Sequence, residues 1–376
     1  MQSILSILLL WLAITTTGYL VPEPPGKYNV TLTTGTLVDY TRDDPYAAEP
    51  TPRALMLSVF QPATCVSTVP VRDMPTETAE YQGPLLKTTF NISVNLSPLF
   101  LEARLPVCSD HPESRSLTHD HPILLFAPGY GIPRVYYNVL ASAIASEGFI
   151  VITIDHQEDA NIIVYPDGHA VYTNASILNS PTWDEYPRAA DASSIIDQLS
   201  NETAMAKLLP QRGPRPFRTD RVAMLGHSVG GASAIVAASR DHRIRGAINW
   251  DGTIFVSPPL SLFQPVLFMN HQNTIDPTWL AAWPQLKGPK LVVHVANSTH
   301  QTFTDVATLF QAAGLSTAPF ADLLGTIAPV QMVQILATYT TAWRNGAFVG
   351  KEGGAVLEGQ ELSKFPEVSI MMKSNC

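Results

Sequence analysis

The sequence predicts an α/β fold in which helices flank a mostly parallel central sheet. From residue 122 onward, short apolar runs alternate with stretches of helical spacing, which is the pattern of βαβ units. The apolar runs show no two-residue alternation, as expected for strands buried on both faces. Hydrophobic residues make up 45% of the 376 residues, which is enough for a core and excludes a disordered chain.

The expected elements begin with two N-terminal strands, over residues 28–40 and 53–61. The Pro- and Ser-rich stretch 62–118, with a strand near 88–94, is expected to decorate the edge of the sheet. The regular part then has strands at 123–127, 149–154, 222–225, 244–250, 266–269 and 291–296 and helices at 135–147, 189–199, 230–239, 301–313 and 330–343. No internal repeat or long linker divides these elements. We therefore expect one α/β domain over residues 19–376 with an N-terminal strand and loop extension.

The chemistry is carried by Gly226-His227-Ser228-Val229-Gly230, a G-x-S-x-G pattern between an expected strand and an expected helix. In that context the pattern is typical of the nucleophile elbow of the α/β-hydrolase fold. The turn leaves no room for side chains at its flanks, and it presents the serine beside a helix N-terminus. We interpret Ser228 as a nucleophile. The alternative is an ordinary strand–helix turn with an idle serine.

A serine hydroxyl needs a base at neutral pH, and in this fold the acid and then the histidine follow the serine along the chain. The histidines after the serine are His242, His271, His294 and His300. His242 ends a helix and is expected to be solvated, whereas His294 lies inside a strand as a core histidine. His300 lies in the loop after a late strand, where this fold delivers its base. We favour His300, and His271 remains open.

Two aspartates compete for the role of the acid. In many such hydrolases the acid follows the strand at 266–269, but that loop carries Asn273 and reaches Asp276 only late. Asp251 directly follows the strand at 244–250, on the edge where parallel strands deliver site residues. An aspartate there can hold the imidazole in the correct tautomer, so we favour Asp251. The alternative without function is an aspartate that merely forms a turn before glycine.

An oxyanion hole needs two backbone donors. The N–H of Val229, directly after the serine, is expected to be one of them. The other is expected from the loop Pro128-Gly129-Tyr130-Gly131 that follows the strand at 123–127. Its glycines allow the backbone to approach a substrate closely. Pro128 has no N–H, so Tyr130 is the better candidate.

These motifs together resemble the secreted platelet-activating-factor acetylhydrolase family, in the form carried by filamentous fungi. The segments that carry the resemblance are Gly226–Gly231, Asn249-Trp250-Asp251-Gly252, His300-Gln301-Thr302-Phe303-Thr304-Asp305 and, more weakly, 149–159. The early position of the acid is the specific feature, because many lipases share the serine motif.

The resemblance covers roughly residues 122–305, and it implies Ser228 as nucleophile, Asp251 as acid, His300 as base and Tyr130 in the oxyanion loop. It implies a secreted serine esterase that releases acetyl or short acyl groups from the glycerol 2-position of phospholipids, without calcium. The N-terminal third and the Tyr130 loop depart from the animal enzymes. Other small esters, including secondary-metabolite acetates, therefore stay open as substrates, as does a peripheral contact with a lipid surface.

Two other functions remain open. A cutinase-like polyester hydrolase would be favoured by an acid one strand later, where Asn273 stands. A non-catalytic binding protein with an esterase fold usually lacks a member of the triad. We expect no cofactor and no metal, because His119-Asp120-His121 is better interpreted as a polar loop before a strand and no phosphate-binding P-loop occurs.

The N-terminus predicts secretion. Residues 4–14 are apolar except for Ser6, and the small or polar residues 15–18 follow, as in the apolar core and cleavage site of a signal peptide. We expect residues 1–18 to be removed and the protein to be extracellular. A membrane anchor is disfavoured because the run is shorter than the ~20 residues that span a bilayer. The formal net charge of −9 and the lack of any basic run exclude a nucleic-acid partner.

Cysteines and glycosylation sequons agree with the secretory route. Cys65 and Cys108 each follow a strand-like run and are expected to form a disulfide, which leaves Cys376 free or removed by processing. N-glycans are expected on some of six N-x-S/T sequons, at Asn29, Asn91, Asn95, Asn174, Asn201 and Asn297. Asn297 is expected to stay largely unmodified, because a glycan beside His300 would crowd the site.

Overall fold

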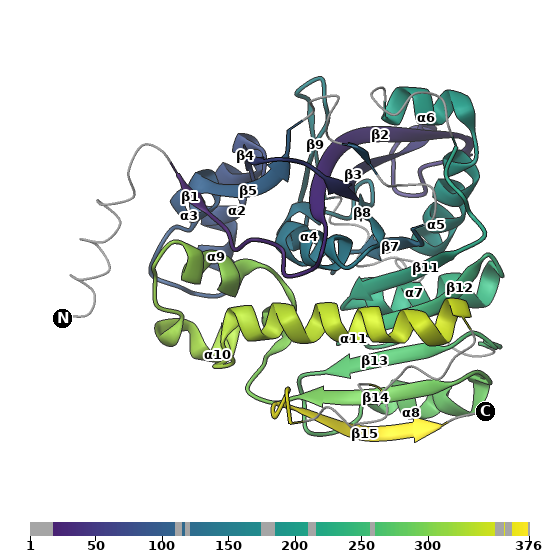
Figure 1. Cartoon of the computed structure of the whole chain (residues 1–376). Helices are drawn as coiled ribbons and strands as arrows, with labels where there is room; N and C mark the ends of the chain where they lie inside the picture. The colour runs from purple at the N-terminus through teal and green to yellow at the C-terminus, as the bar shows by residue number, and fades with distance from the viewer. Residues whose placement is uncertain are drawn as a thin grey trace.

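A ten-stranded mixed sheet forms the centre of the molecule (Figure 1). The computed structural model describes residues 18–109, 115–116, 121–173, 185–209, 216–255, 260–349, 357 and 363–374. Neighbouring strands follow the order β15 (Val368–Ser374), β14 (Lys290–Val295), β13 (Val266–Asn270), β12 (Ile244–Trp250), β11 (Val222–His227), β7 (Ile123–Ala127), β8 (Ile150–Asp155), β3 (Pro52–Thr64) and β2 (Asn29–Asp43), and β6 (Arg115–Ser116) pairs with β3.

The central part of the sheet is parallel, as the sequence predicts. Every neighbouring pair from β8 through β7, β11, β12 and β13 to β14 is parallel, whereas β2, β3 and β15 pair antiparallel at the two edges. Within β7, Leu124 and Phe126 pack into the core on one face, and Ile123 and Leu125 pack into the core on the other. Burial on both faces explains why these strands are continuous apolar runs.

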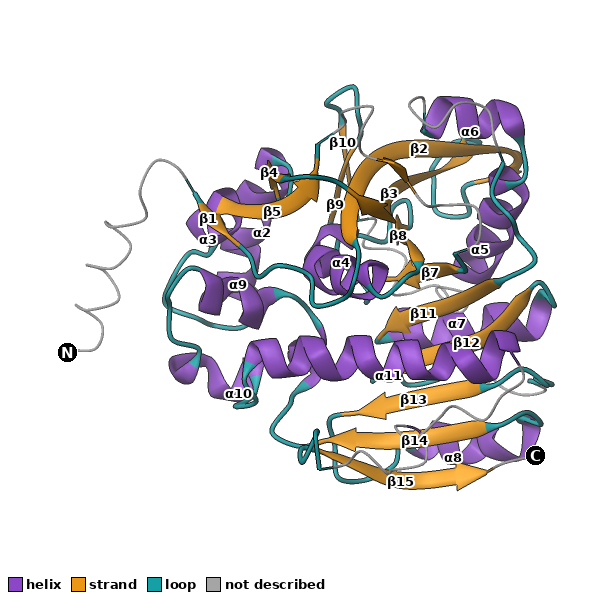
Figure 2. Cartoon of the chain, in the orientation of Figure 1, coloured by secondary structure: helices purple, strands orange, loops and turns teal. Residues whose placement is uncertain are grey.

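Helices cover both faces of the sheet (Figure 2). One core contains side chains of α4 (Asn138–Ser146), α9 (Val306–Ala312), α10 (Ala321–Leu324) and α11 (Pro329–Val349). The other contains side chains of α5 (Glu185–Leu199), α6 (Glu202–Leu208), α7 (Val229–Arg240) and α8 (Pro277–Ala282). The fold is therefore of the α/β-hydrolase type that the serine motif predicts, with helices on both sides of a mostly parallel sheet.

Within the described residues, one helical stretch, Ala318–Trp343, is long and apolar enough to cross a membrane by length and composition alone, with a mean hydropathy of 1.4. In the structure the buried part of this stretch contributes to the core. α11 packs against α4, and the side chains of Met332, Ile335, Leu336 and Tyr339 are buried. Packing inside the fold explains the apolar character of the helix.

The segment 62–118 is more regular than the sequence predicts. It contains β4 (Thr68–Arg72), α2 (Thr76–Thr89), α3 (Ser97–Glu102) and β5 (Ala103–Cys108), and β1 (Tyr19–Leu20), β5 and β4 form a separate three-stranded sheet. The strand expected near 88–94 is wrong, because these residues end α2 and form the turn after it. The buried face of α2 includes polar Thr78 and Gln82, and Pro84 lies inside the helix, so no apolar helical periodicity shows in the sequence.

Two expectations near the C-terminus also need correction. The helix expected at 301–313 is split into a 3-10 turn at His300–Phe303 and α9. Buried Asp305 separates the two, because its carboxylate accepts hydrogen bonds from the N–H groups of Val139 (2.7 Å) and Leu140 (3.1 Å) at the start of α4. The edge strand β15 has mostly half-exposed side chains and was not predicted. The other expected elements are confirmed, with shifted ends.

The expected disulfide is confirmed. Cys65, which follows β3, is bonded to Cys108 at the end of β5, with a Cα–Cα distance of 5.9 Å. This bond ties the small N-terminal sheet to the end of strand β3 in the central one. Cys376 and residues 1–17 of the expected signal peptide lie outside the described residues.

Candidate active site

Ser228 lies in the tight turn between β11 and α7. Its backbone has φ 55° and ψ −131°, a conformation that residues other than glycine adopt only under constraint. A Cβ atom on Gly226 would lie 2.1 Å from the carbonyl carbon of Gly230, and one on Gly230 would lie 2.1 Å from the carbonyl oxygen of Ala127. Both flanking positions therefore require glycine, which explains the spacing of the motif.

Asp251 follows the neighbouring strand β12 in a second strained turn, with φ 57°. Its N–H donates to the carbonyl oxygen of Met269 on β13 (2.8 Å). The buried side chain of Asn249 holds the turn through hydrogen bonds with the N–H (2.7 Å) and the carbonyl oxygen (2.8 Å) of Gly252. A Cβ atom on Gly252 would lie 1.9 Å from the carbonyl oxygen of Ser228. The turn that carries the aspartate thus packs directly against the turn that carries the serine.

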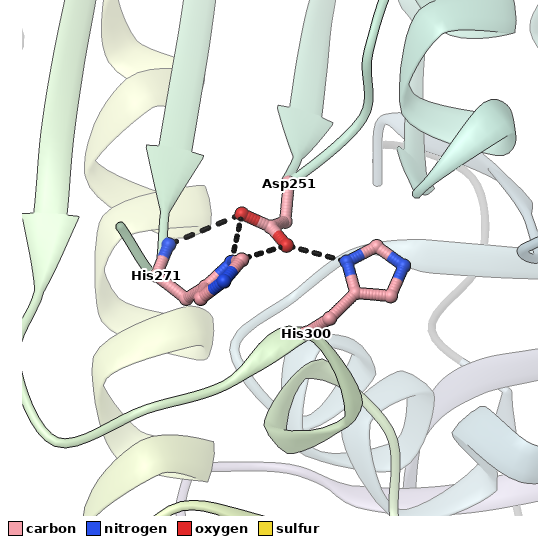
Figure 3. A group of neighbouring side chains, drawn as sticks. All are labelled: Asp251, His271 and His300. Carbon is pink, nitrogen blue, oxygen red and sulfur yellow. Dashed lines mark hydrogen bonds and ion pairs between the residues drawn. The ribbon is translucent and has the colours of Figure 1, made fainter. Parts of the chain in front are cut away.

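His300 reaches Asp251 from the loop after β14 (Figure 3), and its Nδ1 lies 2.5 Å from Oδ2 of the aspartate. A capping box between Thr299 and Thr302 fixes the 3-10 turn that His300 begins. Burial raises the pKa of the Asp251 carboxyl, but hydrogen bonds from His271 and His300 outweigh burial and hold that pKa below its usual range. Asp251 is therefore an ionised acceptor for the imidazole N–H at neutral pH.

His271 contacts the same carboxylate from the other side. Its Nδ1 lies 2.7 Å from Oδ1 and 2.6 Å from Oδ2 of Asp251, and its backbone N–H donates to Oδ1 (3.1 Å). The sequence left His271 open as an alternative to His300, and in the structure both imidazoles share one carboxylate. Spacing along the chain could not reveal this, because the ends of β12, β13 and β14 meet only in the folded sheet.

The other candidates for the acid and the base lie in different surroundings. Asp276 is the N-cap of α8, and its carboxylate accepts hydrogen bonds from the N–H of Thr278 (2.7 Å) and the hydroxyl of Thr253 (2.7 Å). His242 is exposed just after α7, and His294 lies half-buried in β14. Asp276 thus stabilises the start of a helix, while the histidine contacts of this region go to Asp251.

His227 links His300 to the loop after β7, although nothing in the sequence singled it out. Complete burial, together with nearby His300, lowers the pKa of the His227 imidazole well below its usual value and keeps the ring neutral. Its Nε2–H donates to the carbonyl oxygen of His300 (3.0 Å), and its Nδ1 accepts the hydroxyl of Tyr137 (2.9 Å). The Tyr137 hydroxyl in turn accepts the N–H of Gly129 (3.2 Å). This chain of hydrogen bonds holds both segments against the serine turn.

The loop after β7 lies beside the serine, since a Cβ atom on Gly129 would lie 3.4 Å from Cβ of Ser228. The buried guanidinium of Arg188 on α5 donates to the carbonyl oxygens of Pro128 (2.5 Å) and Gly129 (3.5 Å). A peptide unit is planar and trans, so holding the Gly129 carbonyl also sets the direction of the next N–H, that of Tyr130. The sequence did not identify Arg188, because its contacts come from segments distant in the chain.

Ser228, Val229, Asp251 and His300 line one cavity of about 370 Å³. Tyr130 is partly buried and is not one of the residues that line it. The remaining wall is mostly polar, with two aromatic side chains, and consists of Thr253, Phe255, Asn270, His271, Gln272, Asp276 and Trp279. The cavity therefore brings a serine, an acid and a histidine together in a space large enough for a small ester.

The structure also shows where the histidine and carboxylate side chains that could bind a metal ion lie. His119 and Asp120 lie outside the described residues, and His121 has its Nδ1 2.9 Å from the carbonyl oxygen of Gly148. Within the described part of the chain, one group of His and carboxylate side chains has the spacing of a metal site: Asp251, His271 and His300, with ligand atoms within 4.8 Å of one another. The sequence predicted no such group.

Comparison with known proteins shows which family the chain belongs to. Residues 76–186 and 215–342 match the family model described as platelet-activating factor acetylhydrolase, isoform II. The chain belongs to this family. A relative from Arthroderma benhamiae, described as a probable 1-alkyl-2-acetylglycerophosphocholine esterase, is 28% identical over an alignment of 386 positions that covers 94% of each chain. The resemblance inferred from the motifs is therefore confirmed.

Two further relatives extend the comparison. The platelet-activating factor acetylhydrolase of Bos taurus is 26% identical over an alignment of 217 positions that covers 49% of this chain and 48% of the bovine one. A solved ferulic acid esterase from Streptomyces cinnamoneus superposes with a TM-score of 0.76 and 25% identity, covering 94% of this chain and 100% of that one. This member of the platelet-activating-factor acetylhydrolase family is a carboxylic ester hydrolase with an α/β-hydrolase type of fold.

Proposed function

We propose that the protein is a secreted serine esterase that releases acetyl or other short acyl groups through an acyl-serine intermediate. The observation that supports this most directly is the strained turn at Ser228, which faces a cavity that Asp251 and His300 also line. Backbone strain of this kind is concentrated at functional sites. A non-catalytic binding protein would have no need of a serine, a charged acid and a histidine around one cavity.

In the proposed reaction, Nε2 of His300 accepts the hydroxyl proton of Ser228 as Oγ attacks the ester carbonyl carbon. Asp251 holds the Nδ1–H of His300 and stabilises the imidazolium. The N–H groups of Val229 and Tyr130 donate to the oxyanion of the tetrahedral intermediate. His300 then gives its proton to the leaving alcohol, and a water molecule hydrolyses the acyl-serine by the same steps in reverse order.

Arg188 is expected to position the oxyanion donor of Tyr130. Its pairing with Asp159 (2.6 Å) and its bonds to two loop carbonyls need the planar guanidinium, which lysine cannot reproduce. Arg188→Lys is therefore expected to lower kcat about 10²-fold, the loss typical of one oxyanion donor, with little change in KM. Steady-state kinetics on a short-chain p-nitrophenyl ester measure both constants.

Arg218→Lys is the matched control for this prediction, since Arg218 is an exposed arginine that pairs with Asp220 (2.8 Å). It should keep wild-type kcat and KM. Thermal unfolding of Arg188→Lys separates lost positioning from lost folding. A raised KM with unchanged kcat would show that Arg188 acts on substrate binding and not on the transition state.

The proposed substrate is a phospholipid-like or other small ester with a short acyl group. The Arthroderma relative is described as an esterase of 1-alkyl-2-acetylglycerophosphocholine, and the polar wall of the cavity, with Asn270 and Gln272, suits a polar alcohol portion. An ester of an aromatic acid is a second candidate. It is supported by the ferulic acid esterase relative and by Phe255 and Trp279 in the cavity wall.

A substrate panel tests this proposal: p-nitrophenyl esters from acetate to palmitate, 1-alkyl-2-acetylglycerophosphocholine as monomers and in vesicles, and methyl ferulate. We expect kcat/KM to be highest for acetate and to fall with chain length, and we expect the acetylated phospholipid to be cleaved. A maximum at palmitate would contradict the short-acyl proposal, and a maximum at methyl ferulate would support the second candidate. Faster cleavage in vesicles than of monomers would support contact with a lipid surface.

Secretion is the remaining part of the proposal, supported by the Cys65–Cys108 disulfide, which is typical of oxidising compartments. We expect at least two of the exposed sequon asparagines to carry glycans, among Asn29, Asn91, Asn95 and Asn201. Asn174 lies outside the described residues. The side chain of Asn297 is exposed, in a turn with φ 61°. We therefore expect Asn297 to be modified as well.

Glycopeptide mass spectrometry of the protein secreted by a eukaryotic host measures the occupancy of each sequon. A sample treated with an N-glycosidase is the control. Secreted protein without any occupied sequon would contradict the expectation, and an N-terminus at residue 1 in the secreted protein would contradict removal of residues 1–18.

A further inference from the structure

The carboxylate of Asp251 is shared by two imidazoles, although the proposed reaction uses only one of them (Figure 3). His271 follows the end of β13 and His300 lies in the loop after β14, and both Nδ1 atoms are directed at the oxygens of Asp251. The two histidine side chains are partly exposed, at 25% and 39%, and both line the cavity, so an ion from solvent can reach them.

Two imidazole nitrogens and one carboxylate oxygen are a donor set that zinc-like metal ions prefer, whereas magnesium and calcium favour oxygen ligands alone. All three ligand atoms lie within 4.8 Å of one another. Ligands of a tetrahedral zinc ion at 2.0–2.2 Å stand roughly 3.3 Å apart, so the 2.5 to 2.7 Å contacts would need to widen by less than about 1 Å. The loop positions of the histidines allow such a shift.

The charge of the cavity also suits a cation. Two of its lining residues, Asp251 and Asp276, are aspartates, and none of the described residues that line it is a lysine or arginine. The cavity of about 370 Å³ leaves room for the water that commonly completes a three-residue zinc site.

We propose that Asp251, His271 and His300 form a reversible inhibitory site for an imidazole-preferring divalent metal ion such as Zn²⁺. Binding through Nδ1 requires the proton of each neutral imidazole to move to Nε2, with no net release of protons. Nε2 of His300 then carries a proton and cannot accept the one from Ser228. This consequence rests on the proposed function, whereas the binding itself does not.

Binding is measured first, on the full mature chain with Ser228→Ala, so that it does not depend on activity. Titration calorimetry with ZnCl₂ is expected to give one site, and Co²⁺ is expected to give visible absorption bands of a low-coordinate complex. In the Ser228→Ala protein, a second substitution, His271→Gln, should weaken Zn²⁺ binding more than about tenfold and abolish the Co²⁺ bands. The reason is that one of three ligands is lost. MgCl₂ and CaCl₂ should not bind.

His169→Gln is the matched control, because His169 and Asp167 form an exposed pair at 2.5 Å outside the cavity. It should bind Zn²⁺ like the parent. His271→Ala serves as a second variant, in case glutamine disturbs the turn. The absence of a single saturable Zn²⁺ site, or equal affinity with and without His271, would overturn the proposal.

Activity is the second readout, expressed relative to each variant's own rate without metal. Zn²⁺ should inhibit the wild-type protein at the concentrations that saturate the calorimetric site, with reversal by a chelator, and His271→Gln should be resistant. Equal inhibition of both proteins would place the inhibitory ion elsewhere and overturn the proposal. A protein without esterase activity would contradict the proposed function, while the binding measurement would still decide the metal site.

Discussion

Replacement of Ser228 by alanine is expected to reduce ester hydrolysis by about 10⁵-fold or more, as in other serine hydrolases that lose the nucleophile. The change removes only a hydroxyl and keeps Cβ. The strained backbone at φ 55° is therefore as strained in the variant as in the parent, and the fold should be unaffected. Steady-state turnover of p-nitrophenyl acetate and a mass-spectrometric search for an acyl adduct measure the effect.

The control for this variant is Ser239→Ala, at a partly buried hydroxyl near the end of α7 that donates to the carbonyl oxygen of Val236 (2.7 Å). It should retain near-wild-type activity, and thermal unfolding should show both variants to be folded. If Ser228→Ala keeps more than a few per cent of wild-type turnover, another residue is the nucleophile.

Asp251→Asn is expected to lower kcat by up to about 10⁴-fold, the loss seen when the orienting carboxylate of a triad becomes an amide. An amide cannot supply the charge that stabilises the imidazolium of His300. It can also turn its NH₂ toward Nδ1 and favour the wrong tautomer. The same substitution also removes the negative charge that holds the two imidazoles. Because that charge stabilises an imidazolium that forms only in the transition state, kcat should change far more than KM.

Asp276→Asn is the matched comparison, because Asp276 lines the same cavity but caps α8. Asparagine is as good an N-cap as aspartate, so near-wild-type kinetics and stability are expected. Measuring kcat and KM of both variants decides between the two acids. A large loss at Asp276 with little effect at Asp251 would move the acid one strand later.

The sequence by itself determined the central architecture and the position of the serine. Buried parallel strands are apolar runs, and a tight strand–helix turn needs glycine at its flanks, so both features are written in local patterns. The place of Asp251 at a strand end followed from the same local signals, whereas the order of the strands in the sheet came from the structure. The Cys65–Cys108 bond was predicted because each of these cysteines follows a strand-like run, and the structure brings the ends of β3 and β5 together.

Only the tertiary structure decided how the surroundings of the serine are built. His271 shares Asp251 with His300, Arg188 reaches the Gly129 loop, and α2 forms in a segment expected to be irregular. The physical reason is the same in each case. Some side chains bond to a group that only sheet pairing brings near, and some helices bury polar and small residues. In both cases the segment of sequence shows no periodic pattern that would predict the interaction. Such interactions exist only once distant segments are packed, and they are where the proposed catalytic and metal-binding properties arise.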